Sequence, residues 1–124
     1  MDVLFVDDDV DDREFFMDAL SYVNPKLICV VAKDCKDALA LLDQSEKLPS
    51  YIFLDINMPA MDGKGCIAQI KKDARLDSVK VVMYSTSSDE REMVEYKTLG
   101  ATFFLVKPAT FKELCDALAV MLDH

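Results

Sequence analysis

The stretch Tyr51-Ile-Phe-Leu-Asp-Ile-Asn-Met-Pro59 decides the fold, because an apolar run there ends in a single carboxylate, Asp55. Aspartate and asparagine are poor strand formers, and proline cannot continue a central strand. We therefore predict a buried strand over 52–54, followed by a loop that Asp55 opens and Pro59 keeps out of the sheet. Open parallel sheets bind ligands at the carboxyl ends of their strands, so this loop predicts a functional site.

The length and composition of the chain indicate one globular domain. It has 124 residues, of which 52% are hydrophobic and 30% charged, and no apolar run is long enough to span a membrane. The first residues carry Asp2 rather than a basic segment, which disfavours a secretory signal. We therefore expect a cytoplasmic, single-domain protein covering 1–124, without an output domain and without membrane attachment.

The charge balance narrows the class of partner. The net charge of −9, without a basic run, argues against direct binding of nucleic acid and favours cations or basic protein surfaces. The cysteines are scattered without a C-x-x-C pair, and His124 is the only histidine. We therefore expect no zinc site and no disulfide, and four reduced cysteines in or near the core: Cys29, Cys35, Cys66 and Cys115.

Apolar runs alternate with helical patterns along the rest of the chain. Strands are predicted at 3–6, 27–32, 52–54, 79–84 and 102–106, with the run 27–32 buried on both faces. Helical periodicity follows each of them, at 10–23, after Asp34, over 66–74, from the Ser87 capping box to Leu99, and from the Thr110 capping box to the end. Gly100 fits the position just after the fourth helix. This alternation predicts an α/β fold in which helices cover both faces of a doubly wound, five-stranded parallel sheet.

Side chains that could bind a ligand or take part in a reaction follow four of these strands. Asp7 and Asp8 end the first, Asp55 the third, Ser85 the fourth and Lys107 the fifth. The topology brings these side chains to one edge, where three carboxylates require a counter-charge. Oxygen ligands favour Mg²⁺, the usual companion of a phosphoryl group, and an attacking aspartate would form an aspartyl phosphate.

The sequence resembles the receiver domain of two-component response regulators, specifically the single-domain chemotaxis type, over essentially the whole chain. Four blocks carry the resemblance: Phe5-Val-Asp-Asp8, Leu54-Asp-Ile-Asn-Met-Pro59 with Asp62-Gly63, Met83-Tyr-Ser85, and Lys107-Pro108. The resemblance implies a flavodoxin-like (βα)5 fold with strand order 2-1-3-4-5. It also implies a switch, rather than a turnover enzyme, that a histidine kinase, a phosphotransfer protein or a small phosphodonor phosphorylates.

The resemblance also implies a role for each matching residue. Asp55 would be the phosphoacceptor, Asp8 a direct Mg²⁺ ligand, Asp7 a ligand mainly through water, and Asn57 a ligand through its backbone carbonyl. Ser85 and Lys107 would hold the phosphoryl group, and the Lys107–Pro108 bond would be cis. Phe104 stands at the switch aromatic, where tyrosine is frequent. A phenylalanine there has no hydroxyl, so we expect the switch to act by shape on the surface formed by 88–122, which would bind the downstream protein.

Several alternatives remain beside this interpretation. Asp9, Asp11 and Asp12 fit a solvated helix start, since acids favour the first turn of a helix. A phosphatase acting through an aspartyl phosphate would need a second acid two residues after Asp55, where this chain has Asn57. A phosphorelay intermediate, or a receiver belonging to a larger regulator, is equally compatible with the sequence. We expect a monomer before phosphorylation and allow a dimer after it.

Overall fold

The computed structural model describes residues 1–58 and 62–122. Pro59, which we expect to keep the loop out of the sheet, lies outside the described residues. Five strands form one parallel sheet in the order β2-β1-β3-β4-β5, which confirms the predicted fold. The strands are β1 (Val3–Val6), β2 (Cys29–Ala32), β3 (Tyr51–Asp55), β4 (Lys80–Ser85) and β5 (Phe103–Val106).

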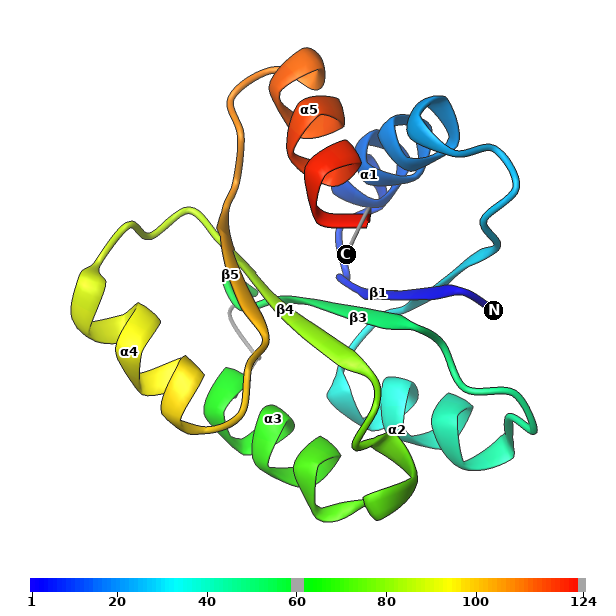
Figure 1. The fold of residues 1–124 in the computed structure, drawn as a ribbon, viewed down its shortest axis with the longest axis vertical. Helices are drawn as coiled ribbons and strands as arrows, with labels where there is room; N and C mark the ends of the chain where they lie inside the picture. The colour runs from blue at the N-terminus through cyan, green and yellow to red at the C-terminus, as the bar shows by residue number, and fades with distance from the viewer. Residues whose placement is uncertain (59–61, 123–124) are drawn as a thin grey trace.

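Helices cover both faces of this sheet. They are α1 (Val10–Val23), α2 (Cys35–Gln44), α3 (Gly63–Lys72), α4 (Glu90–Thr98) and α5 (Phe111–Leu122), and a short 3₁₀ turn, Ala74–Leu76, follows α3. Figure 1 shows α1 and α5 side by side on one face and α2, α3 and α4 on the other. Within the described part of the chain, no helix is long and apolar enough to cross a membrane.

Alternate residues of the central strands build two separate cores. On β1, Leu4 and Val6 pack toward α2 and α3, whereas Val3 and Phe5 pack toward α1 and α5. Phe5 stacks on Phe16 of α1 with ring centroids 4.1 Å apart. A parallel strand covered on both faces must be apolar throughout, which explains why all four residues of β1 are fully buried.

Strand β2 departs from the prediction that the run 27–32 is buried on both faces. Only Ala32 is buried, and the other three residues of β2 are half-buried. The reason is topological, since β2 lies at the edge of the sheet and pairs with β1 alone. An apolar run predicts a strand, but its composition does not distinguish a central strand from an edge strand.

Because the strands are parallel, every helix begins at the carboxyl edge of the sheet, and aspartates cap most of these helices. Four aspartates each accept a hydrogen bond from a backbone N–H in the first turn of a helix. We call them the cap aspartates: Asp9, Asp34, Asp62 and Asp89. The prediction that Ser87 caps α4 was wrong, since Asp89 does so two residues later. Thr110 caps α5 as predicted, with its Oγ1 3.1 Å from the N–H of Glu113. Gly100 follows α4 with φ 111°, a conformation that favours glycine.

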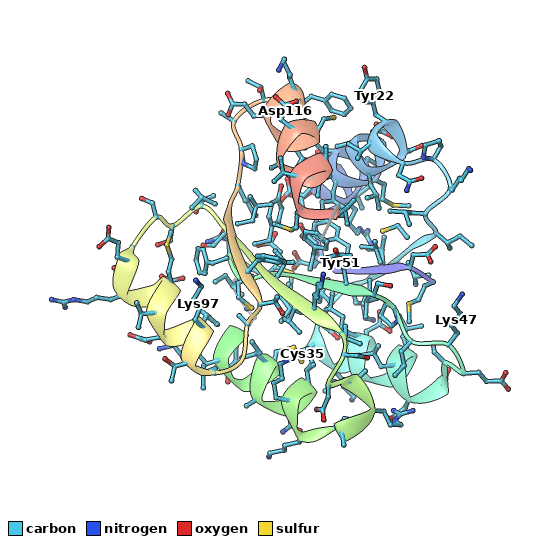
Figure 2. All side chains as sticks on the ribbon, viewed as in Figure 1. Tyr22, Cys35, Lys47, Tyr51, Lys97 and Asp116 are labelled. Atoms are coloured by element: carbon cyan, nitrogen blue, oxygen red, sulfur yellow. A yellow bond between two sulfur atoms is a disulfide. The ribbon has the colours of Figure 1, made fainter. Side chains whose placement is uncertain are left out.

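A disulfide joins Cys35 to Cys66, so the prediction that all four cysteines are reduced was wrong. The two residues are 31 apart in sequence, but α2 and α3 lie on the same face of the sheet, and their Cα atoms are 5.9 Å apart. This separation is ordinary for a disulfide. Figure 2 labels Cys35, near the start of α2. Cys29 and Cys115 remain free thiols, and burial raises the pKa of Cys29 to about 11.

Candidate phosphoacceptor and metal site

Four strands deliver polar side chains to the carboxyl edge of the sheet. Asp55 is the last residue of β3 and Ser85 the last residue of β4, whereas Asp7 and Lys107 directly follow β1 and β5. Asp7, Asp55 and Ser85 are buried, with 0%, 2% and 0% of their surface exposed. Buried polar groups are rare without partners, so these three identify the edge as the place to search for chemistry.

Asp55 and Lys107 form a direct ion pair. The Lys107 Nζ lies 2.8 Å from Asp55 Oδ2, and the two side chains are only 16% and 3% exposed. The other carboxylate oxygen, Oδ1, accepts a hydrogen bond from the backbone N–H of Asn57. The Lys107 ammonium also lies 5.3 Å from the centre of the Tyr84 ring. A nucleophilic carboxylate at this position therefore has a cation beside it that can follow negative charge onto an incoming group.

Lys107 reaches Asp55 with its own peptide bonds trans. No cis peptide bond occurs in residues 1–58 and 62–122, so the expected cis Lys107–Pro108 bond was wrong. The trans form is the intrinsically favoured one, by about 0.5 to 1 kcal/mol for a bond before proline. The Lys107 N–H donates to the Ser85 carbonyl at 2.6 Å, which fixes the chain where β5 ends.

Asp7 is a buried acid with an incomplete set of partners. Its Oδ1 accepts a hydrogen bond from the Asp9 N–H, whereas its Oδ2 is buried without any partner among residues 1–58 and 62–122. Burial raises the pKa of Asp7 to about 7, and the nearby Asp55 carboxylate adds to the rise. A buried, unpartnered carboxylate oxygen is expensive unless a proton or a cation meets it.

Among the described residues, the carboxylates of Asp7, Asp55 and Asp12 form one group, and we call these the site aspartates. One oxygen from each lies within 4.8 Å of the other two. Oxygen donors with this spacing fit a hard divalent cation such as Mg²⁺, and the unpartnered Asp7 Oδ2 is the atom that such an ion would satisfy. The residues present therefore fit the metal that the sequence predicts.

The positions of the Asp12 and Asp8 carboxylates relative to the site differ from those that the sequence predicts. Asp12, interpreted as a solvated helix residue, also lies 3.8 Å from the Lys107 Nζ. Asp8, expected as a direct ligand, is exposed and is not among these close carboxylates. Its N–H donates to the Met58 Sδ, and it lines a cavity together with Cys35 and Cys66. The sequence carries no signal that separates Asp12 from Asp9 and Asp11, since all three lie at the start of one helix.

Asn57 connects the loops after β3 and β4. Its side-chain Oδ1 accepts a hydrogen bond from the Thr86 N–H at 2.7 Å. The Ser85 Oγ accepts a hydrogen bond from the Ser87 N–H at 3.0 Å. Both loops are therefore held by side chains of the predicted site, and a movement of the Ser85 hydroxyl would release a backbone N–H of the segment leading to α4.

Phe104, the predicted switch aromatic, lies half-buried between the sheet and α4. Its ring centre is 6.1 Å from that of Tyr96, the buried residue of α4. It pairs with Met83 in the register of β4 and β5, two residues before Ser85. The path from the Ser85 hydroxyl to the ring that supports α4 is thus short.

The sequence profile of the response regulator receiver domain matches residues 3–119. The chain belongs to this family. It is a receiver domain of the kind that two-component systems use for phosphorylation-dependent signalling, which confirms the resemblance found in the sequence. The interaction of receivers with kinases and with downstream targets is a property of the family as a whole.

Relatives support this assignment in sequence and structure. A probable transcriptional regulator, ycf27 of Guillardia theta, is 35% identical over 90% of the receiver chain, which spans 41% of that relative's length. Response regulator Rcp1 of Synechocystis is 27% identical, over 90% of the chain and 80% of Rcp1. The phosphorylated cyanobacterial phytochrome response regulator RcpA superposes with a TM-score of 0.85 at 27% identity, over 98% of the chain and 91% of RcpA.

A related structure also bears on the metal. The Mn²⁺-bound form of Rcp1 superposes with a TM-score of 0.78 at 25% identity, over 96% of the receiver chain and 89% of Rcp1. In the receiver chain, the site aspartates are a group whose oxygens could hold a metal ion.

Proposed function

We propose that this receiver domain is a cytoplasmic switch that accepts a phosphoryl group on Asp55 with the help of Mg²⁺. The observation that carries the proposal is the buried Asp55, paired with Lys107 at 2.8 Å and lying beside the unpartnered oxygen of Asp7. The donor is a histidine kinase, a phosphotransfer protein or a small phosphodonor such as an acyl phosphate. The function is that of a switch rather than a turnover enzyme.

The residues have distinct tasks in the transfer. An oxygen of Asp55 attacks phosphorus, and the bond from phosphorus to the donor's nitrogen or oxygen breaks, with its electron pair leaving on the donor. Asp7, Asp8, Asp55 and the Asn57 carbonyl are the proposed metal ligands, and the bound cation would neutralise charge on the phosphoryl oxygens. Lys107, which contacts the Asp55 carboxylate before transfer, then contacts the phosphoryl group. The Ser85 hydroxyl turns away from the Ser87 N–H and toward the phosphoryl group.

The output is proposed to lie on the surface of α4, β5 and α5. Strand β5 is an edge strand whose four residues are all half-buried. Apolar grooves flank it on both sides, one lined by Met93, Val94 and Phe104, the other by Leu105 and Val120. Because Phe104 lines the first groove, its movement changes the shape that a downstream protein meets.

Labelling by a small acyl phosphate tests the proposal. The wild type should gain one phosphoryl group in Mg²⁺ and none in EDTA, and Asp55→Asn should lose the label. Asp34→Asn is the matched control, because Asp34 is an exposed cap aspartate at the same edge and asparagine caps helices equally well. Equal labelling of wild type and Asp55→Asn would overturn the assignment.

A phosphatase is the alternative from the enzyme class. The position two residues after Asp55 holds Asn57, whose side-chain oxygen is engaged with the Thr86 N–H. An amide cannot exchange the proton that repeated hydrolysis requires, so we expect no sustained turnover of a phosphate monoester. Many turnovers per protein molecule would instead establish a hydrolase.

The phosphodonor and oligomeric state need separate measurements. Phosphotransfer from a panel of histidine kinases and phosphotransfer domains would identify the donor and would separate an end-point switch from a relay intermediate. We propose a monomer before phosphorylation, and a tight dimer in sedimentation without phosphate would contradict it.

A further inference from the structure

Asp12 occupies a position that the family comparison does not assign. It is the third residue of α1, and its side chain is 49% exposed, so helix capping and core packing do not explain where its carboxylate points. The cap of this helix is Asp9, which accepts the Asp11 N–H at 2.9 Å. Asp12 is therefore free to serve the site that its carboxylate approaches.

The carboxylate of Asp12 lies close to three residues of the proposed phosphorylation site. Its carboxylate lies 3.8 Å from the Lys107 Nζ and within 4.8 Å of oxygens of Asp7 and Asp55. Asp11, one residue earlier on the same helix turn, has no part in this group of carboxylates. Two acids of equal charge and similar helix position thus differ in one respect, which is their proximity to the site.

Charge counting shows that the site is incomplete. The three grouped carboxylates have one ammonium group beside them, that of Lys107, which pairs with Asp55 and lies near Asp12. Two negative charges are left to be balanced when all three acids are ionised. The Asp7 Oδ2, fully buried and without a partner in the part of the chain that the structure describes, independently marks where positive charge is missing. A divalent cation supplies that charge.

We propose that Asp12 is a positioning residue for the divalent cation of this receiver, acting from α1 on the ion's water ligands while sharing Lys107 with Asp55. The inference rests on the proposed function, since it concerns the same metal. Mg²⁺ keeps several waters when proteins bind it, and carboxylates beyond the direct ligands orient those waters. Removal of such partners weakens metal affinity by about 10- to 100-fold, and the partial exposure of Asp12 places it at about 10-fold.

Calorimetric titration of the full chain with MgCl₂ at pH 8 and constant ionic strength tests this. Asp12→Asn should weaken Mg²⁺ binding about 10-fold, whereas Asp11→Asn should weaken it less than about 2-fold, because exposed charges outside the site are screened by salt. Asp12→Glu should recover part of the affinity, since it restores the carboxylate.

Two outcomes would overturn the inference. One is unchanged or tighter Mg²⁺ binding by Asp12→Asn, and the other is equal losses in Asp12→Asn and Asp11→Asn, which would indicate only the general field of the helix start. Should Asp12→Asn fail to fold, Asp12→Ser is titrated under the same criteria. Failure of the proposed function differs, because the wild type would then bind Mg²⁺ without becoming labelled on Asp55.

Discussion

The carboxyl edge of the sheet holds two groups of aspartates that do opposite things. The cap aspartates, Asp9, Asp34, Asp62 and Asp89, are exposed, and each is satisfied by a backbone N–H of the helix that it starts. The site aspartates, Asp7, Asp12 and Asp55, approach one another and share Lys107 or lack a partner. The first group stabilises the helices, whereas the second leaves negative charge at the site without a balancing positive charge. Substitutions in the two groups should therefore have different effects on stability.

The largest effect is expected from removing Lys107, the ammonium group that Asp55 and Asp12 share. Lys107→Met leaves the carboxylate of Asp55, 3% exposed, without its ion pair. Breaking a buried pair in this way should lower the free energy of unfolding by about 3 to 5 kcal/mol in urea denaturation at pH 8 without metal. Lys112→Met is the control, since its pair with Asp116 is exposed and should contribute less than about 1 kcal/mol. Equal losses in the two variants would place Lys107 among ordinary surface lysines.

The acid that lacks a partner should make stability depend on pH. Asp7 has its pKa raised to about 7, so between about pH 4 and 7 the folded protein holds a proton that the unfolded chain has released. The free energy of unfolding of the metal-free protein therefore falls as the pH rises through this window, by at most about 4 kcal/mol.

Asp7→Asn should remove this fall and stabilise the metal-free protein above pH 7. The cap variant Asp34→Asn should keep the wild-type pH dependence, because that carboxylate is exposed and hydrogen-bonded to its own helix. Denaturation in EDTA at a series of pH values measures both. Identical pH profiles for Asp7→Asn and Asp34→Asn would show that the buried oxygen is not a cost to the fold.

The disulfide lies at the same edge and should offset part of this cost. Cys35 begins α2, directly after the cap aspartate Asp34, and Cys66 lies in the first turns of α3. Cross-linking residues that are 31 apart restricts the unfolded chain, and Cys35→Ser should lower the free energy of unfolding by about 2 to 4 kcal/mol. Cys29→Ser, which removes a free thiol, is the comparison under non-reducing conditions. An unchanged midpoint in the wild type after dithiothreitol treatment would contradict the disulfide's contribution.

The smallest effect concerns the cap aspartates themselves. Asp89→Ala should lower the free energy of unfolding by about 1 kcal/mol, because the Arg91 N–H loses its acceptor. Ser87→Ala, at the residue that the sequence indicates as the cap, should cost less than about 0.5 kcal/mol by the same measurement, since its Oγ accepts only the Asp89 N–H ahead of the helix. A larger loss for Ser87→Ala would reverse the assignment of the cap.

The two groups also show what the sequence can and cannot predict. Strand ends are visible as apolar runs that stop at a polar residue, and parallel topology then brings Asp7, Asp55, Ser85 and Lys107 to one edge without further information. Contacts between helices are not visible in this way. Asp12 resembles its neighbours Asp9 and Asp11, and Cys35 shows no relation to Cys66, until the helices that carry them are placed on the sheet.

The central claim is that Asp55, among the aspartates at this edge, takes the phosphoryl group. The most direct test treats the wild type with a small acyl phosphate as phosphodonor in the presence of Mg²⁺. Borohydride then reduces the aspartyl phosphate formed on the protein to homoserine, and peptide mass spectrometry locates that residue. Homoserine is expected at position 55 alone. Homoserine at position 7 or 12, or at a cap aspartate, would contradict it.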